Sequence, residues 1–265
     1  MLLMSTVKKL YWRHLVEVDS IGKVLTIGNS QAGVIKLAYE KYYKSSINID
    51  FWTMPGGRGP FINIRDGIMF PQEQRKQSLL TDITGYESGV TLNDYSSILI
   101  SGVGVGALRN INHGIIQENL VAEFLKSIEG SKAIISKQFA TYLLEQEVLN
   151  SPSFNNIINI GEVFTGNIFV QLFPIPTDLA NQKDFDLPYG QSLSSFLSWF
   201  CATQLSVIES KLKVFKNIKI LKYPEEWYQQ GYSPKEYAIA NDAWHMNILF
   251  GKYLLERLKN AGDRS

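Results

Sequence analysis

Five short runs of apolar residues recur along the chain, and most of them end at a glycine or a proline. Near-continuous apolar runs that stop at turn residues are typical of strands buried on both faces of a sheet. Between these runs, apolar residues return every three or four positions, which predicts helices. The predicted strands are 24–27, 47–52, 98–101, 168–173 and 218–221, and the predicted helices are 32–43, two within 117–149 (broken near Gly130), 193–215 and 246–258.

Strands that alternate with helices predict a parallel sheet, because each parallel neighbour needs a crossover connection. We therefore expect one three-layer α/β/α domain over residues 1–265, with a flavodoxin-like five-stranded parallel sheet in the order 2-1-3-4-5. Two segments without clear periodicity, at about 55–95 and 174–190, are expected to be long loops.

Composition excludes several classes of protein. Hydrophobic residues make up 45% of the chain, so it is expected to fold around a core. A net charge of +1 lacks the basic excess of nucleic-acid binders. The single cysteine, Cys201, permits no internal disulfide, and no Cys/His spacing indicates a metal site. No uncharged apolar run reaches the ~18 residues of a membrane span, and the start of the chain does not resemble a secretory signal. We expect a soluble, cytoplasmic protein.

Candidate chemistry begins where the first predicted strand ends, at Gly28-Asn29-Ser30-Gln31. This order places Ser30 at the carboxyl end of a strand and at the N-terminus of a helix, where open parallel sheets bind ligands. A serine there is a candidate nucleophile, and its own N–H is a candidate oxyanion donor. The alternative is a helix cap, because Asn and Ser are preferred at that position.

A second candidate lies before the last predicted helix, in Asp242-Ala243-Trp244-His245. A spacing of three residues lets one helical turn bring the carboxylate of Asp242 to the ring of His245. A carboxylate fixes the tautomer of an imidazole and stabilises its cation, so the pair suits an orienting acid and a general base. The alternative is that Asp242 caps the last helix.

Together the two motifs resemble the SGNH, or GDSL-type, hydrolase superfamily over nearly the whole chain. Gly28-Asn29-Ser30-Gln31 stands where that family has Gly-Asp-Ser, and Asp242 and His245 match its Asp-x-x-His. The resemblance implies a flavodoxin-like fold and acyl-ester chemistry, with Ser30, Asp242 and His245 as the catalytic residues. It requires neither a metal nor a cofactor.

The resemblance also implies oxyanion donors after the second and third strands. Gly56 or Gly57 is the predicted donor after strand two, and Gly102 is the candidate after strand three. There the chain departs from the family, because Ser101 to Gly106 contains no asparagine. Asn29, Gln31 and Arg58 are the predicted substrate-binding residues.

The tetrapeptide Gly-Asn-Ser-Gln at 28–31 also resembles the Gly-Asn-Cys-Gln start of a capsule-polysaccharide O-acetyltransferase family. Three functions therefore remain open. The first is a serine esterase or deacetylase acting on a small-molecule or carbohydrate ester. The second is an O-acetyltransferase with acetyl-CoA as its donor substrate, and the third is a non-catalytic binding protein on the same fold.

Overall fold

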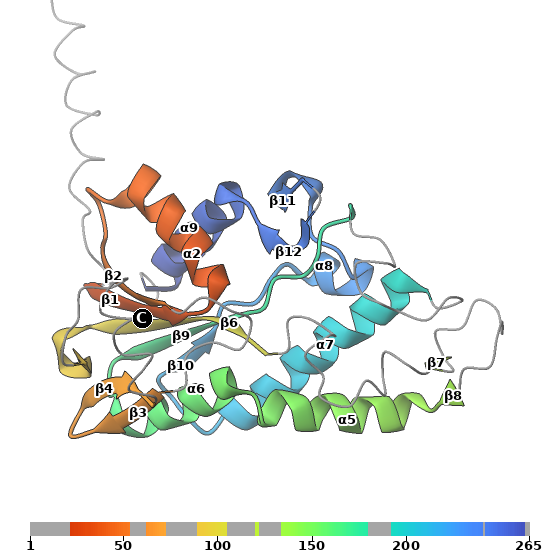
Figure 1. The fold of residues 1–265 in the computed structure, drawn as a ribbon, viewed down its shortest axis with the longest axis horizontal. Coiled ribbons are helices and arrows are strands. Elements are labelled where there is room, and N and C mark those ends of the chain that lie inside the picture. Colours follow the sequence, from red (N-terminus) through yellow and green to blue (C-terminus); the bar gives the residue numbers. More distant parts are fainter. Residues whose placement is uncertain are drawn as a thin grey trace, which may run out of the picture.

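The computed structural model describes residues 22–53, 62–72, 89–104, 120–121, 134–179, 192–240 and 242–262. A five-stranded sheet runs through its centre, and each neighbouring pair of strands that is hydrogen-bonded in register is parallel (Figure 1). The spatial order is β2-β1-β6-β9-β10, which is 2-1-3-4-5 when these five strands alone are counted along the chain. The predicted α/β class is confirmed. The strands are β1 (Lys23–Gly28), β2 (Asn48–Thr53), β6 (Ser97–Val103), β9 (Asn167–Leu172) and β10 (Ile218–Ile220).

The central strands are the ones with continuous apolar sequence. Every residue of β6 is buried, as are the last five residues of β1 and of β9, because helices cover both faces. The edge strand β10 is only half-buried throughout. Burial on two faces removes the alternation of polar and apolar positions, which is why these strands are readable from the sequence as apolar runs.

Helices form a layer on each face of the sheet (Figure 1). On one face lie α2 (Ser30–Ala38), which continues as the π-helix η1 (Tyr39–Tyr43), and α9 (Ile248–Gly262). On the other face lie α5 (Lys137–Leu149), α6 (Pro152–Val163) and α7 (Leu193–Leu212), while the short helix α8 (Glu225–Gln230) packs on α7.

Helices α2 and α9 approach each other closely at a glycine. A Cβ atom added at Gly251 would lie 2.3 Å from the carbonyl oxygen of Val34 and 2.9 Å from the Cβ of Ala38. Only a residue without a side chain fits this crossing, so α9 is held directly against α2.

The segment predicted as a long loop at 55–95 contains regular structure. Strands β3 (Ile62–Arg65), β4 (Ile68–Pro71) and β5 (Val90–Thr91) form a small antiparallel sheet, followed by the 3₁₀ helix η2 (Leu92–Asp94). The β3–β4 hairpin turns at Asp66-Gly67, whose φ angles of 53° and 74° are those of a type I′ turn. The Asp-Gly pair was the signal for this hairpin. Of the loop predicted at 174–190, residues 174–179 are described and form no helix, although Thr177 makes a bridge to Ser233.

Two of the predicted helices were wrong in extent. Within 117–149 only α5 is helical among the described residues, whereas β7 (Leu120–Val121) pairs in parallel with β8 (Ile134–Ile135). Residues 242–246 form strand β12 (Asp242–Met246), paired with β11 (Ala238–Ile239), so the last helix begins at Ile248. Helix α6, capped by Ser151 and led by Pro152, was not predicted. In the part of the chain that is described, no helix is both long enough and apolar enough to cross a membrane.

We predict that Gly251→Ala lowers the free energy of unfolding by about 1–3 kcal/mol, because the new methyl group must displace the backbone of α2. Gly33→Ala is the matched control, since a Cβ there meets nothing within 4 Å. The control is expected to stabilise the helix by about 0.5–1 kcal/mol. Urea unfolding followed by circular dichroism measures both, and equal effects of the two variants would show that the crossing is not tight.

Candidate functional site

The turn from β1 into α2 is held by Asn29. Its Oδ1 accepts a hydrogen bond from the backbone N–H of Gln31 at 2.9 Å, which caps the helix. Its Nδ2 donates to the carbonyl oxygen of Gly102 at 3.4 Å, at the end of the neighbouring strand β6. Asn29 therefore fixes the start of α2 and joins it to the next strand of the sheet. The helix cap that this segment predicts is therefore confirmed, and Asn29 is the residue that provides it.

Ser30 is the first residue of α2 and is partly exposed. Backbone N–H groups in the first turn of a helix have no acceptor within the helix, and the helix dipole adds partial positive charge there. The Ser30 N–H therefore lies where developing negative charge is stabilised. The hydroxyl and the backbone N–H of Ser30 therefore both lie at the carboxyl edge of the sheet.

Asp242 and His245 form a hydrogen-bonded pair. The Nδ1 atom of His245 lies 2.8 Å from Oδ2 of Asp242, and the backbone N–H of His245 donates to Oδ1 of the same carboxylate at 3.0 Å. Both oxygens of Asp242 thus contact His245. The side chains remain 44% exposed for His245 and 34% exposed for Asp242, so the opposite ring nitrogen, Nε2, belongs to an accessible ring.

The pair does not sit on a helical turn. It lies in β12, where Ala238 pairs with Met246 and Ile239 pairs with Asp242. Residues 243–245 therefore have no partner on β11, and they form an arch between the two paired positions. The alternative in which Asp242 caps the last helix is wrong, because Asn247 accepts the hydrogen bond from Leu249 N at 2.9 Å.

The two halves of the candidate site belong to neighbouring elements. Strand β12 contacts α2, and Figure 1 shows the β11–β12 hairpin above the carboxyl edge of the sheet, on the face covered by α2 and α9. Helix α9, which follows β12 directly, packs along α2. The fold thus brings the strand that carries Asp242 and His245 against the helix that begins with Ser30.

A buried polar network lies behind Gly102. The Oε1 atom of Gln171 accepts hydrogen bonds from Ser101 Oγ at 2.6 Å and from Gly102 N at 3.2 Å. The amide of Gln171 donates to Tyr223, whose hydroxyl donates to Leu172 O at 2.8 Å. Burial raises the pKa of Tyr223 well above its usual range, so this hydroxyl keeps its proton. Gln171 is a polar residue near the end of the otherwise apolar run of β9, and this contrast in the sequence could have indicated a buried polar network.

This network includes Gly102, one of the predicted oxyanion donors. Its N–H donates to Oε1 of Gln171 at 3.2 Å, so this internal hydrogen bond competes with the predicted role, which stays a prediction. Gly102 also has a structural role. Its φ of 76° is in the left-handed region that favours glycine, and an added Cβ would lie only 2.6 Å from Oδ1 of Asn29. It lets β6 approach the cap of α2.

Two of the predicted substrate-binding residues are buried. Asn29 and Gln31 are each 2% exposed, so in this structure they offer almost no surface to a substrate, and Asn29 has the structural role described above. Gly56, Gly57 and Arg58 lie outside the described residues, and their predicted roles stay predictions.

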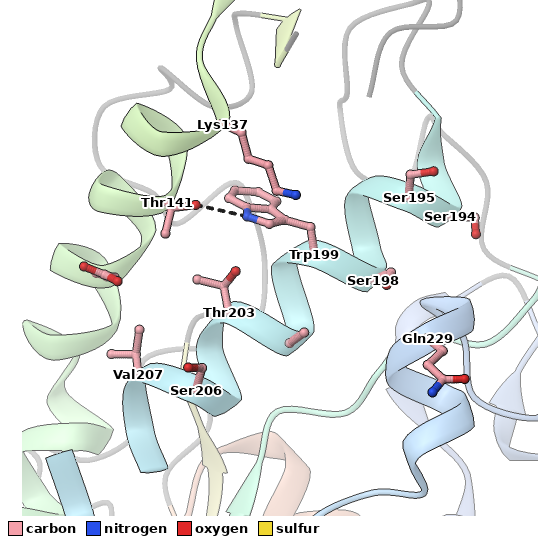
Figure 2. Close-up of a pocket in the computed structure, with 12 residues that line it drawn as sticks. Lys137, Thr141, Ser194, Ser195, Ser198, Trp199, Thr203, Ser206, Val207 and Gln229 are labelled. Atoms are coloured by element: carbon pink, nitrogen blue, oxygen red, sulfur yellow. Dashed lines mark hydrogen bonds between the residues drawn. The ribbon is translucent and has the colours of Figure 1, made fainter. Parts of the chain in front are cut away.

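A separate groove of about 600 Å³ lies between α5 and α7 (Figure 2). Trp199 crosses it and donates from Nε1 to Thr141 Oγ1 at 3.1 Å. No candidate catalytic residue lines this groove, so it is not part of the site formed by α2 and β12. Within the described ranges, no three His, Cys, Asp or Glu side chains lie close enough to hold a metal ion. The hydroxyl-bearing residues of the groove are Thr141, Ser194, Ser195, Ser198, Thr203 and Ser206.

No protein-family model matches this sequence, and no curated protein matches it. Among solved structures, a Streptococcus pneumoniae protein described as a "putative platelet activating factor" is 14% identical with a TM-score of 0.42, over 97% of this chain and 90% of that one. Protein YxiM of Bacillus subtilis is 11% identical with a TM-score of 0.40, over 92% of this chain and 58% of that one. Likeness at this level adds nothing to what the chain's own residues show.

We predict that Asn29→Ala lowers the free energy of unfolding by about 1 kcal/mol, because α2 loses its cap. Asn29→Ser keeps a side-chain acceptor suited to the cap and adds no charge, while it loses the donation to Gly102 O, so its effect is expected to be smaller. Urea unfolding of the two variants measures the difference. An equal loss in the Ser variant would mean that the link to β6, and not the cap, is the important contact.

Proposed function

We propose that this protein is a serine acyl-ester hydrolase with Ser30 as nucleophile, His245 as general base and Asp242 as the group that orients the imidazole. One observation carries the proposal. The hydrogen-bonded pair of Asp242 and His245 is partly exposed on a strand that contacts the helix beginning with Ser30. The same residues match the positions of the catalytic motifs of the SGNH superfamily, which supports this choice.

In the first half of the reaction, Ser30 Oγ attacks the carbonyl carbon of the ester. The bond from Oγ to carbon forms while the proton of the hydroxyl passes to Nε2 of His245. Asp242 holds Nδ1–H at 2.8 Å and stabilises the imidazolium that results. The tetrahedral intermediate then collapses, and the departing alcohol takes the proton from Nε2. An acyl group remains on Ser30.

In the second half, water replaces the alcohol. His245 accepts a proton from the water as its oxygen bonds to the acyl carbon, and Ser30 Oγ leaves with that proton. The carboxylic acid is released and the enzyme returns to its starting state. If a sugar hydroxyl attacks the acyl group on Ser30 in place of water, the protein acts as a transferase, and an acyl-CoA is the acyl donor.

The Ser30 N–H supplies one donor for the oxyanion in this proposal, at the N-terminus of α2. Gly56 or Gly57 remains the predicted second donor. Gly102 N is bonded to Gln171, and the asparagine of the SGNH superfamily that the chain resembles is missing after β6, so we expect the proposed site to have fewer oxyanion donors than that superfamily has. The loss of one oxyanion donor lowers kcat by roughly 10²–10³. We therefore expect slow turnover.

We predict that the protein hydrolyses p-nitrophenyl acetate and that Ser30→Ala and His245→Ala each lower kcat/KM by roughly 10³-fold or more. Asp242→Asn is expected to act in the same direction, because an amide no longer selects the Nδ1–H tautomer. Release of p-nitrophenolate measures the rates. Ser46→Ala is the matched control: its hydroxyl donates to Tyr43 O beyond the far end of α2.

Intact-mass measurement adds a second test, because the wild-type protein is expected to gain one acetyl group that Ser30→Ala does not. Equal turnover by the wild type and all three site variants would overturn the proposal. If the protein transfers acetyl from acetyl-CoA to a glycan and Ser30→Ala abolishes this transfer, its function is that of a transferase and not of a hydrolase. Glycan binding without turnover would indicate the non-catalytic protein. An acetylated carbohydrate is the first natural substrate class to assay, on the resemblance stated above.

A further inference from the structure

The arch that carries His245 is closed at one end by Asn247. The Nδ2 atom of Asn247 donates to the carbonyl oxygens of Glu236 at 2.6 Å and of Ala238 at 3.0 Å. Ala238 is the residue of β11 that pairs with Met246, the neighbour of His245. One side chain therefore clamps the paired position at which the arch rejoins the hairpin.

The same side chain starts the last helix. Its Oδ1 accepts hydrogen bonds from Leu249 N at 2.9 Å and Phe250 N at 3.4 Å, so all the hydrogen-bonding capacity of the amide oxygen is used for α9. The backbone N–H of Asn247 donates to Tyr237 O at 2.9 Å. Asn247 thus joins β11, β12 and α9 at a single point.

The elements on either side of this point are rigidly packed. The ring of Tyr237 lies 5.7 Å from Trp227, 5.5 Å from Phe250 and 5.7 Å from Tyr253, measured between ring centroids. Met246 is 1% exposed, and α9 is held against α2 at Gly251. Asn247 links this packed base to a partly exposed ring two residues away.

We propose that Asn247 is a positioning residue, which sets where the His245 ring stands relative to Asp242 and to Ser30; the consequence for catalysis rests on the function proposed above. The described pairs on β11 are Ala238 with Met246 and Ile239 with Asp242, so residues 243–245 lie between two paired positions. At the Asp242 end the carboxylate contacts His245 directly. At the other end, Asn247 clamps the backbone beside His245 through its hydrogen bonds to Glu236 O and Ala238 O.

Asn247→Ser tests this proposal without adding charge. Serine is a good N-cap and keeps the start of α9, but its hydroxyl is too short to reach Glu236 O and Ala238 O. With p-nitrophenyl acetate, kcat is expected to fall by roughly 10- to 100-fold while KM stays unchanged, because small displacements of catalytic groups have effects of this size. The ¹⁵N shifts of the neutral His245 ring are expected to move from the Nδ1–H tautomer towards a mixture, with signals assigned by His245→Gln.

Asn217→Ser is the matched control. Asn217 Nδ2 also donates to two carbonyl oxygens, those of Phe164 at 2.8 Å and Gly166 at 3.0 Å, at the opposite end of the sheet. Its replacement is expected to lower thermal stability to a similar extent and to leave kcat and the tautomer of His245 unchanged. A merely structural role of Asn247 would make the two variants alike.

The proposal is overturned if Asn247→Ser keeps both the wild-type kcat and the wild-type tautomer, or if Asn217→Ser loses kcat equally. Should Asn247→Ser fail to fold, Asn247→Thr is used instead, because threonine also caps a helix, adds no charge and is too short to reach Glu236 O and Ala238 O; the tautomer of His245 is compared in that variant. If the wild-type protein has no turnover, the proposed function fails, and the ¹⁵N measurement still decides whether Asn247 positions the ring.

Discussion

The contact between α2 and α9 holds together two distant parts of the chain that carry the proposed catalytic residues. Ser30 begins α2, and Asp242 and His245 lie just before α9. The two helices meet at Gly251, where the backbone of one lies against the other with no side chain between them. A parallel sheet alone would bring together only the residues that follow its strands. Here the helix crossing adds the hairpin that precedes α9, and the proposed roles of Asp242 and His245 depend on it.

Buried polar groups hold the other side of the site. Asn29 joins the start of α2 to Gly102, and Gln171 joins Gly102 to Tyr223. Polar groups inside a protein are stable only when they are hydrogen-bonded, so such a network accepts few alternative arrangements. The arrangement also consumes the N–H of Gly102. The hydrogen bonds that hold the carboxyl edge therefore also occupy an N–H that the SGNH resemblance predicted as an oxyanion donor.

The sequence predicted the five strands of the sheet because each is a continuous apolar run, and their ends were right to within a few residues. It predicted the pairing of Asp242 with His245 for the wrong local reason, since a spacing of three fits a helical turn and also an arch in a strand. The hydrogen bond from Gly102 to Gln171 joins residues 69 positions apart, and no local pattern reports it. The β3–β4 hairpin could have been predicted from the Asp66-Gly67 pair at its turn.

Because Asp242 and His245 are only three residues apart on β12, the carboxylate and the imidazole are close neighbours along the chain. Ser30, the proposed nucleophile, belongs to a different element, α2. A breathing motion of the hairpin would therefore carry the carboxylate and the imidazole together. Relative motion within the proposed site then reduces chiefly to one distance, that between this pair and the Ser30 hydroxyl.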